Sequence, residues 1–558
     1  MREKWIALVG PEYEENLSLR YLASSLTAAG YASRIIAFNR PGDLPRVLAA
    51  IMDGQGDADE PPLLVGLSLA FQWRAQDFLA LAIALRESGF GGHITAGGHF
   101  ATFACKELLT DFRELDSICR QEAEQTIVSL ARALDGGGEL SSIAGLALRD
   151  ASGAVMVTPD PALPDLTKLP RPDRRGNAAS CFGHGIAPLV GSRGCYANCS
   201  FCCIAAWHEV SQPGKRYRLR TPEDIAGEMF DLWSERGVEV FVFHDDNFFL
   251  PGHAKNVERI NAIADALLER GLGPGTFATV VKARPVDVDA AVFHALVHRL
   301  GCIRVYVGIE TDADQGLVTL NRWAQSKQNH RAVEVVRALG LYTCFNLLLF
   351  DPDTTVDSIE RNVKFLRSAP ELPFNFGRVE LYAGTPLLGR MQLEERCWGD
   401  YLQWNYALAT EGVERIYRLA MKCFHARNFG DDALANRIMG TRFDVEVARF
   451  FHADVFRASW LAQGEALSRA LAIDTADGLA AIVARVKSDA PASGDEEFCA
   501  QISVGLRAQE RAIGRGAKAL AREIAGVLGR GKPLTEIGDR VATPLQDTHG
   551  RAQKEIRS

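Results

Sequence analysis

Three cysteines, Cys195, Cys199 and Cys202, are the residues of this chain with the clearest chemical meaning. They are spaced C-x3-C-x2-C, with the aromatic Phe201 directly before the last of them. Thiolates are the soft ligands that iron–sulfur clusters require, and one short loop presents three of them here. A zinc ion with Cys203 as a fourth ligand is the alternative. Adjacent cysteines rarely bind one zinc ion together and no second C-x2-C pair follows nearby, so the spacing favours a cluster.

The other eight cysteines are scattered along the chain and show no ligand spacing. We find no signal peptide and no transmembrane run in the sequence, so we expect a cytoplasmic protein without membrane partners. Thiols stay reduced in that compartment, and disulfides are therefore not expected.

Length and composition indicate a large globular enzyme. The chain has 558 residues, enough for about three or four domains. Its net charge of −8 does not suggest a broad nucleic-acid surface. We expect domains over residues 1–150, 185–390 and 391–530, a linker over 151–184 and a polar tail over 531–558.

Strand and helix patterns alternate in the first domain, which predicts an open, doubly wound, Rossmann-like α/β sheet. Such sheets bind ligands at the carboxyl ends of their strands. No G-x-G-x-x-G motif is present, so a dinucleotide is not favoured. Gly97 and Gly98 follow an apolar run and would let the backbone approach a bulky ligand closely. The strands are predicted over residues 5–10, 33–38, 62–69 and 93–100.

The second domain repeats strand and helix patterns in a way that predicts a partial (β/α)6 barrel. Thr221 and Pro222 are suited to begin a helix that runs to about Arg236. Barrel chemistry gathers at the carboxyl ends of the strands. The later strands are predicted over residues 238–243, 276–282, 303–308, 342–350 and 377–382. Candidate site residues near these ends are Asp245, Asp246, Lys282, Glu310 and Arg322.

The third domain is predicted to be helical and carries no metal or catalytic motif. Trp398, Tyr401 and Trp404 are spaced by three, which would place them on one face of a helix. Packing is the favoured interpretation of this stripe, and the lining of a substrate cavity is the alternative.

Several of these motifs resemble those of one enzyme family. The segment 194–202 resembles the cluster loop of the radical S-adenosylmethionine (SAM) enzymes, and Gly308-Ile309-Glu310 resembles the family segment that lies along SAM. The string 97–102 and Ser68 resemble the cobalamin-binding domain that precedes the cluster domain in B12-dependent members. The resemblance covers about residues 1–390 and is to the cobalamin-dependent radical SAM enzymes.

This resemblance implies three cofactors, which are a [4Fe–4S] cluster, SAM and cobalamin. The three cysteines would hold three irons and leave the fourth iron to the amino and carboxylate groups of SAM. Glu310 and Arg322 are the implied catalytic residues. The implied SAM contacts are Phe201, Asp245, Asp246, Lys282, Gly308, Glu310 and Arg322. The implied cobalamin contacts are Ser68, Arg74, Gly97, Gly98, His99, Phe100 and Glu122.

The sequence departs from the family pattern in two places. Where relatives often carry G-E-G-E, residues 121–124 read Gln-Glu-Ala-Glu, so the acidic pair is kept without the glycines. The loop 11–16 has no D-x-H-x-x-G motif, which implies cobalamin without a histidine ligand from the protein. Arg74 or Trp73 would then lie below the cobalt, although a surface role for Arg74 is an equal alternative.

By resemblance, the chain is expected to be a radical methyltransferase. It would move a methyl group from SAM through methylcobalamin to an unactivated carbon, after a 5′-deoxyadenosyl radical has removed a hydrogen atom. The substrate would be a secondary metabolite, another small molecule or a peptide, and electrons would come from a flavodoxin or ferredoxin. A cyclising or ring-rearranging enzyme and a non-catalytic cobalamin sensor are the alternatives.

Overall fold

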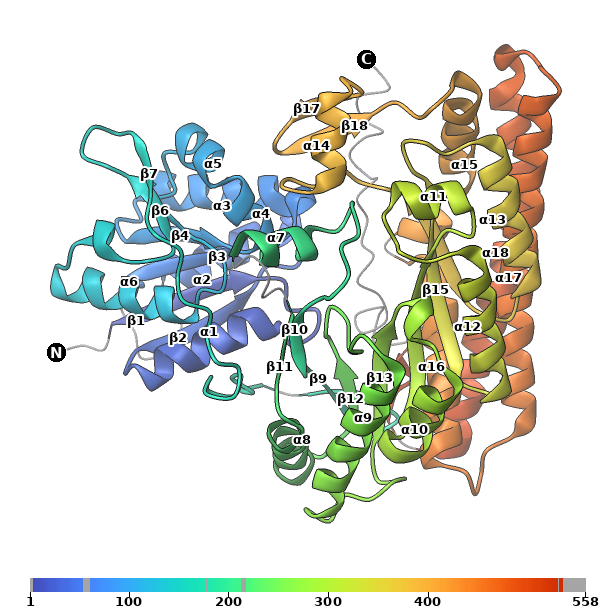
Figure 1. The fold of residues 1–558 in the computed structure, drawn as a ribbon, viewed down its shortest axis with the longest axis horizontal. Helices are drawn as coiled ribbons and strands as arrows, with labels where there is room; N and C mark the ends of the chain where they lie inside the picture. The colour runs from blue at the N-terminus through green and yellow to red at the C-terminus, as the bar shows by residue number, and fades with distance from the viewer. Residues whose placement is uncertain are drawn as a thin grey trace. The chain divides into compact units, whose positions relative to one another are not determined.

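The chain folds into two compact units that interleave along the sequence. The computed structural model describes residues 4–53, 61–176, 178–211, 217–430, 432–529 and 531–534. The N-terminal unit comprises residues 1–177, 193–220 and 380–405. The barrel unit comprises residues 178–192, 221–379 and 406–558. Figure 1 shows their elements.

The N-terminal unit is built on a seven-stranded sheet of order β2-β1-β3-β4-β5-β6-β7. The first five strands in this order are parallel, and β6 and β7 add an antiparallel edge. The strands are β1 (Trp5–Gly10), β2 (Ala32–Ala37), β3 (Leu64–Ser68), β4 (His93–Gly97), β5 (Ser117–Cys119), β6 (Leu146–Arg149) and β7 (Val155–Val157).

Helices cover both faces of this sheet, as the alternating residues of β1 show. Trp5, Ala7 and Val9 pack into one core with α2 and α3, whereas Ile6 and Leu8 pack into another with α1 and α6. A strand buried on both faces is typical of a doubly wound sheet, and that prediction is confirmed. The helices are α1 (Leu17–Ala28), α2 (Leu44–Met52), α3 (Ala75–Glu87), α4 (His99–Phe103), α5 (Cys105–Asp111) and α6 (Glu124–Gly136).

Two later segments complete the N-terminal unit. The first carries the short strands β10 (Ser192–Gly194) and β11 (Tyr217–Leu219), which pair with each other, and helix α7 (Cys203–Ser211). The second carries α14 (Pro386–Leu393), β17 (Cys397–Asp400) and β18 (Gln403–Tyr406).

The predicted helical stripe of Trp398, Tyr401 and Trp404 is wrong, because these residues belong to the β17–β18 hairpin. Gly399 has a φ of +105° and lies so close to the Gln403 carbonyl that a Cβ would approach its oxygen to 2.2 Å. This turn cannot be helical. Tyr401 instead donates a hydrogen bond to Asp111 at 2.8 Å.

The barrel unit contains a second seven-stranded sheet, of order β16-β15-β14-β13-β12-β9-β8. Six strands are parallel and the short β8 is antiparallel, so the predicted partial (β/α)6 barrel is confirmed. The strands are β8 (Ala179–Cys181), β9 (His184–Leu189), β12 (Val238–Phe243), β13 (Ala278–Ala283), β14 (Cys302–Glu310), β15 (Tyr342–Phe350) and β16 (Phe374–Arg378).

The last barrel strand begins and ends earlier than predicted. Residues 374–378 pair with β15, whereas the sequence indicated a strand over 377–382. The Phe374 ring stacks on Phe345 with the two ring centroids 5.6 Å apart, and this contact sets the register. The strand therefore ends before residues 380–385, which belong to the N-terminal unit.

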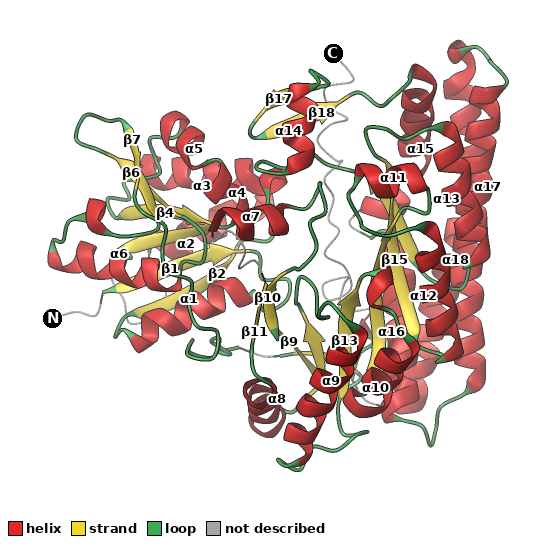
Figure 2. Ribbon diagram, in the orientation of Figure 1, coloured by secondary structure: helices red, strands yellow, loops and turns green. Residues whose placement is uncertain are grey.

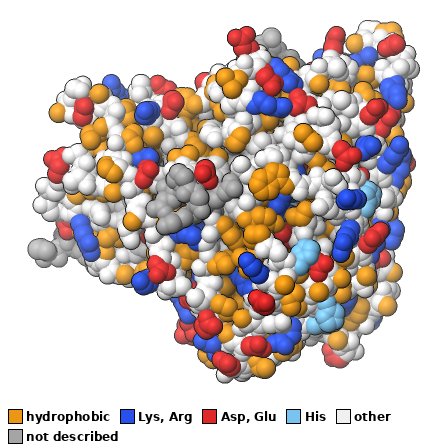
Figure 3. Space-filling model, viewed as in Figure 1, with side chains coloured by type: hydrophobic (Ala, Val, Ile, Leu, Met, Phe, Trp, Pro, Cys, Tyr) orange, Lys and Arg blue, Asp and Glu red, His pale blue; other side chains and the backbone are white. Residues whose placement is uncertain are grey.

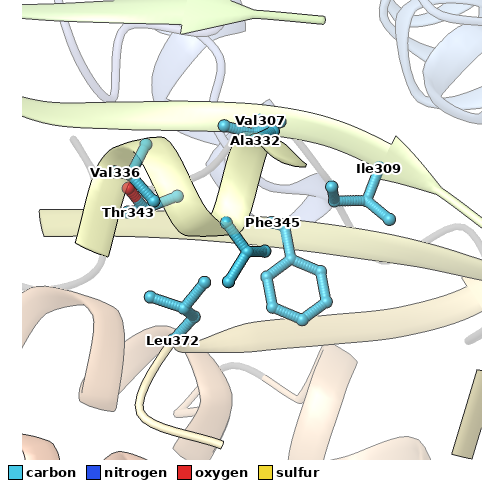
Figure 4. Close-up of a pocket in the computed structure, with 8 residues that line it drawn as sticks. Val307, Ile309, Ala332, Val336, Thr343, Phe345 and Leu372 are labelled. Atoms are coloured by element: carbon cyan, nitrogen blue, oxygen red, sulfur yellow. The ribbon is translucent and has the colours of Figure 1, made fainter. Parts of the chain in front are cut away.

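The two faces of the barrel sheet have different coverings. Val307, Ile309, Thr343 and Phe345 point outward and line a small apolar cavity beneath α12 (Figure 4). Because side chains alternate along a strand, the even-numbered residues of β14 and β15 face the concave side. The outer helices are α8 (Pro222–Arg236), α9 (His253–Leu268), α10 (Ala290–Leu300), α11 (Asp314–Thr319), α12 (Ser326–Ala338) and α13 (Val356–Ser368).

A helical C-terminal region closes the amino-terminal half of the concave face. Met439, Phe443 and Val447 of α16 pack in one core with strand residues such as Val240 and Cys344. The long helices α17 and α18 lie side by side, and both pack against α16 (Figure 2). The region contains α15 (Glu411–Phe429), α16 (Leu434–Phe451), α17 (Ala458–Lys487) and α18 (Asp495–Leu528).

The predicted polar tail begins inside this core. Leu534 is buried, and its N–H donates to Asp444 at 2.7 Å. The Lys532 carbonyl accepts from Phe182 N–H at 3.0 Å. Residues 531–534 therefore pack against the barrel unit, and residues 535–558 of the predicted tail lie outside the described residues.

The described helices can be compared with the length and hydropathy that a membrane span requires. None of these helices is both long enough and apolar enough to span a membrane. On the face shown in Figure 3, basic and acidic side chains are interspersed.

Removing the Phe443 ring tests whether α16 belongs to the core of the barrel. Phe443 is 1% exposed, so Phe443→Ala should lower the free energy of unfolding by about 3–5 kcal/mol. Val504→Ala on α18 is the control, because Val504 is 64% exposed. Urea unfolding measures both variants, and equal stability losses would contradict the packing of α16 against the sheet.

Candidate cofactor and active site

The cysteine loop lies in the N-terminal unit, between β10 and α7. Cys199 is buried, Cys195 and Cys202 are half-buried, and the Cys202 N–H donates to the Cys199 carbonyl at 3.2 Å. Burial, together with the neighbouring Cys203 and Cys199 thiols, raises the pKa of Cys202 well above its ordinary value. Ligation by a metal would be needed to hold this thiol as a thiolate at neutral pH.

Two arginines fix the base of this loop to the N-terminal sheet. Arg193, two residues before Cys195, donates to Glu122 at 2.6 Å and to Glu124 at 2.7 Å. Arg218 of β11 pairs with the second oxygen of Glu122 and donates to the Pro164 carbonyl at 2.9 Å. The Glu122 and Glu124 carboxylates come from the turn before α6 and its first residue, so the network joins the loop to that helix.

The far end of the loop is held by a third segment of the unit. Leu387 N–H donates to the Ser200 carbonyl at 2.8 Å, next to Phe201. Phe201 itself is half-buried in the loop. The segment 382–387, which the sequence indicated to be structural, thus supports the cysteine loop.

Ser68 and Gly97 end neighbouring strands, at the carboxyl edge of the N-terminal sheet. Gly98 has a φ of +113°, and a Cβ there would approach the backbone of Ala70 to 2.7 Å. A side chain at this position is therefore excluded by the loop itself. The carboxyl edge between β1 and β3, where the strand order reverses, is where sheets of this topology bind ligands.

His99 connects this edge to the cysteine loop. Its ring packs on Trp207 of α7, with the ring centroids 4.8 Å apart. Burial lowers the pKa of His99 to about 4, so the imidazole is neutral at physiological pH. Phe100 is buried and its ring stacks on Tyr401, so any contact between Phe100 and a ligand would come from its backbone.

Arg74 is an internal residue, so the surface role considered for it is wrong. Its side chain is 6% exposed and donates to Asp77 at 2.9 Å. It also donates to the carbonyls of Asn39 at 2.9 Å and Phe38 at 3.2 Å. Trp73 beside it is half-buried.

The edge also contains an unsatisfied group that the sequence did not single out. Gln121 is 4% exposed, and neither amide atom has a hydrogen-bond partner among the described residues. An orphaned buried amide beside a glycine loop fits an edge that receives a bulky, hydrogen-bonding cofactor such as cobalamin.

At the carboxyl edge of the barrel, the two predicted aspartates lie in different environments. Asp245 is 1% exposed and accepts from Gly191 N–H at 2.9 Å and from the Ser192 hydroxyl. Burial raises the pKa of Asp245 although Arg259 opposes the effect. Asp246 is exposed at the same strand end. Asp245 therefore holds the backbone that leads to the cysteine loop, and Asp246 is the better placed of the two to meet a ligand.

Glu310 and Arg322 are brought together as predicted. Arg322 lies 3.9 Å from Glu310 and donates to the Gly308 carbonyl at 2.5 Å. A Cβ at Gly308 would approach the Glu310 carboxylate to 2.8 Å, so a side chain at this strand position would displace that carboxylate. Glu310 itself has a φ of +62°. Lys282 of β13 pairs in register with Tyr306 of β14, which precedes Glu310 by four residues.

Asn346 is a member of this cluster that sequence reasoning missed. Its amide donates to Glu310 at 2.8 Å from the middle of β15. A single asparagine within an otherwise apolar strand was the available signal, because buried polar groups need a partner. The concave face is thus packed against α16 in one part and carries a polar cluster around Glu310 in another.

Comparisons with known proteins match the segments that carry both predicted cofactor sites. A family model described as the radical SAM superfamily matches residues 189–366, and one described as the B12 binding domain matches residues 4–131. An uncharacterized methyltransferase of Pyrococcus horikoshii is 26% identical over 57% of this chain and 63% of its own. The anaerobic magnesium-protoporphyrin IX monomethyl ester cyclase of Rubrivivax gelatinosus is 26% identical over 49% of this chain and 48% of its own. The chain thus spans about half to two thirds of the length of these curated relatives.

A solved structure has the same fold. It is the cobalamin-dependent SAM radical enzyme OxsB with aqua-cobalamin and SAM bound. The match has a TM-score of 0.64 at 17% identity and covers 95% of this chain and 83% of that one.

Alanine substitutions of the four neighbouring cysteines test the cluster assignment. Cys195→Ala, Cys199→Ala and Cys202→Ala should each remove iron, sulfide and the absorbance near about 400 nm, because each deletes one thiolate ligand. Cys203→Ala is the matched control and should keep all three signals. Anaerobic iron and sulfide analysis measures the result, and equal losses in all four variants would contradict a three-cysteine cluster.

Proposed function

Because the chain belongs to the cobalamin-dependent radical SAM enzymes, we propose that it is a methyltransferase. It moves a methyl group from SAM, by way of cobalamin, to an unactivated carbon of a small molecule or peptide. The observation that carries this proposal is the contact between His99, at the predicted cobalamin edge, and Trp207, on the helix that follows the cluster cysteines. Two cofactor loops that touch within one compact unit are suited to serve one reaction.

The cofactors provide the difficult chemistry and the protein provides the positions. When bound, the cluster and SAM supply a carbon radical that removes a hydrogen atom from substrate, and cobalamin supplies the methyl group. In our proposal Cys195, Cys199 and Cys202 bind the cluster. Arg193 and Arg218 hold the loop that carries these cysteines, through Glu122 and Glu124.

At the barrel, Glu310 is proposed to accept hydrogen bonds from the ribose hydroxyls of SAM. The Asn346 amide donates to this carboxylate and Arg322 lies 3.9 Å from it, so both side chains help to hold it in place. Asp246 is proposed to meet the SAM amino group, and Arg322 or Lys282 the SAM carboxylate. Because Gly308 has no side chain, the Glu310 and Arg322 side chains have space to lie beside one another.

A cyclase is the second candidate function, because the cyclase of Rubrivivax gelatinosus matches this chain at the same identity as the methyltransferase of Pyrococcus horikoshii. A cyclase would use the same cluster and SAM residues without transferring a methyl group. External electrons are needed in either case, and we propose a flavodoxin or ferredoxin as the donor, in the cytoplasm.

The ratio of two products distinguishes the candidates. A radical methyltransferase should form 5′-deoxyadenosine and S-adenosylhomocysteine in about equal amounts, because each turnover uses one SAM as radical source and one as methyl donor. A cyclase should form 5′-deoxyadenosine without matching S-adenosylhomocysteine. Anaerobic assays with candidate substrates and chromatography of both products measure the ratio, and S-adenosylhomocysteine without 5′-deoxyadenosine would contradict any radical route.

Glu310→Gln tests the proposed SAM contact. The amide keeps the size of the side chain but removes the charge that accepts hydrogen bonds, so SAM binding should weaken roughly tenfold or more. The cluster content should not change, because Glu310 lies outside the cysteine loop. Glu334→Gln on the exposed side of α12 is the control. Equilibrium dialysis with labelled SAM measures both, and unchanged affinity in Glu310→Gln would remove Glu310 from the site.

A further inference from the structure

Gln121 is a buried amide that the fold by itself leaves unsatisfied. It lies two residues after β5 and is 4% exposed. Neither its Oε1 nor its Nε2 atom has a partner within the described part of the chain. Most buried polar side chains find hydrogen-bond partners, so such a group needs an explanation.

The backbone of Gln121 is also in an unusual conformation. Its φ is +61°, in the left-handed region that glycine adopts freely and that other residues seldom occupy. Glycine would fit this position without strain and would leave no orphaned amide. Neither the turn nor the packing explains why a glutamine is there.

The position of Gln121 places it at the predicted cobalamin edge. Its N–H donates to the Thr102 hydroxyl at 3.0 Å, and that hydroxyl donates to the Gly98 carbonyl at 2.9 Å. A Cβ on Gly97 would lie 3.3 Å from the carbonyl oxygen of Cys119. Gln121 therefore adjoins the Gly97–Gly98 loop at the carboxyl ends of β4 and β5, on the same edge of the sheet as the switch point between β1 and β3.

The chemistry of the amide restricts what Gln121 can bind. The carboxylates next to it in sequence are engaged elsewhere, Glu122 by Arg193 and Arg218 and Glu124 by Arg193. A phosphate or carboxylate group only accepts hydrogen bonds when ionised, so it would leave the Gln121 Oε1 atom unpaired. A group that both donates and accepts satisfies both amide atoms at once.

We propose that the Gln121 side chain binds a primary carboxamide on the rim of the corrin ring of cobalamin. A carboxamide offers one N–H donor and one carbonyl acceptor in the same plane, so two such groups pair through two hydrogen bonds. The proposal rests on the assignment of cobalamin as a cofactor. It adds a contact that distinguishes a rim carboxamide from a rim carboxylate.

Replacing Gln121 by glycine separates a ligand contact from a structural role. Gln121→Gly removes the amide and fits the left-handed backbone, so the cobalamin-free protein should be at least as stable as wild type. Its dissociation constant for cobalamin should rise roughly tenfold, as expected for two lost hydrogen bonds in a buried site. Glu395→Gly is the matched control, because Glu395 has a φ of +54° in the same unit and is exposed. It should leave cobalamin affinity unchanged.

A set of corrinoids tests the chemistry of the contact. The full chain with its reconstituted cluster is titrated, by equilibrium dialysis, with cobalamin and with cobalamin monocarboxylates in which one rim carboxamide is hydrolysed. Wild type should discriminate against one monocarboxylate by roughly tenfold, and Gln121→Gly should lose that discrimination. Thermal unfolding of the cobalamin-free variants measures stability in parallel.

Three results would overturn the proposal. If Gln121→Gly binds cobalamin as wild type does and keeps the same discrimination, the amide holds only a water molecule and the cobalamin assignment stands. If Gln121→Gly is markedly less stable without cobalamin, the side chain is structural. If wild type binds no cobalamin at all, the cofactor assignment fails together with the proposal.

Discussion

The buried ion-pair network of Arg193, Arg218, Glu122 and Glu124 is the interaction on which the N-terminal unit depends. Charges removed from water are costly unless they are paired, and removing one partner of such a network typically costs about 3–5 kcal/mol. Both carboxylates are less than 10% exposed, and each meets a guanidinium within 2.7 Å. Since Arg193 precedes Cys195 by two residues, the same network decides where the cluster loop lies relative to the predicted cobalamin edge.

In the barrel unit, one half of the concave face of the sheet packs against helices and the other half carries the candidate site residues. Helix α16 packs Phe443 and other apolar side chains against the amino-terminal half of the concave face. In the carboxyl half, Arg322 and Asn346 each lie beside Glu310. An open half-barrel would otherwise expose its apolar strands, so the C-terminal helices complete a core that the six strands cannot close by themselves.

Two left-handed residues mark the ends of strands in both units. Glu310 ends β14 with a φ of +62°, and Gln121 follows β5 with a φ of +61°. Side chains other than glycine occupy this region at a cost of about 1 kcal/mol or more, and such residues cluster at functional sites. In both places a glycine would relieve the backbone but would remove a polar side chain from an edge that we propose to bind a ligand. The polar side chains and the left-handed backbone conformations therefore occur at the same carboxyl edges of the two sheets.

Local features of this protein could be predicted from neighbouring residues. The spacing of the cysteines, the alternation of strands with helices, and β12 and β15 with their predicted limits depend on nearby residues, so periodicity and composition revealed them. The tertiary structure decided what depends on residues far apart in sequence. Glu122 meets an arginine 71 positions later, Arg74 is tied to the backbone of residues 38–39, and Asp245 holds Gly191. Contacts between residues far apart in sequence determine which of several similar polar side chains remains available for a ligand. A local sequence pattern does not contain that information.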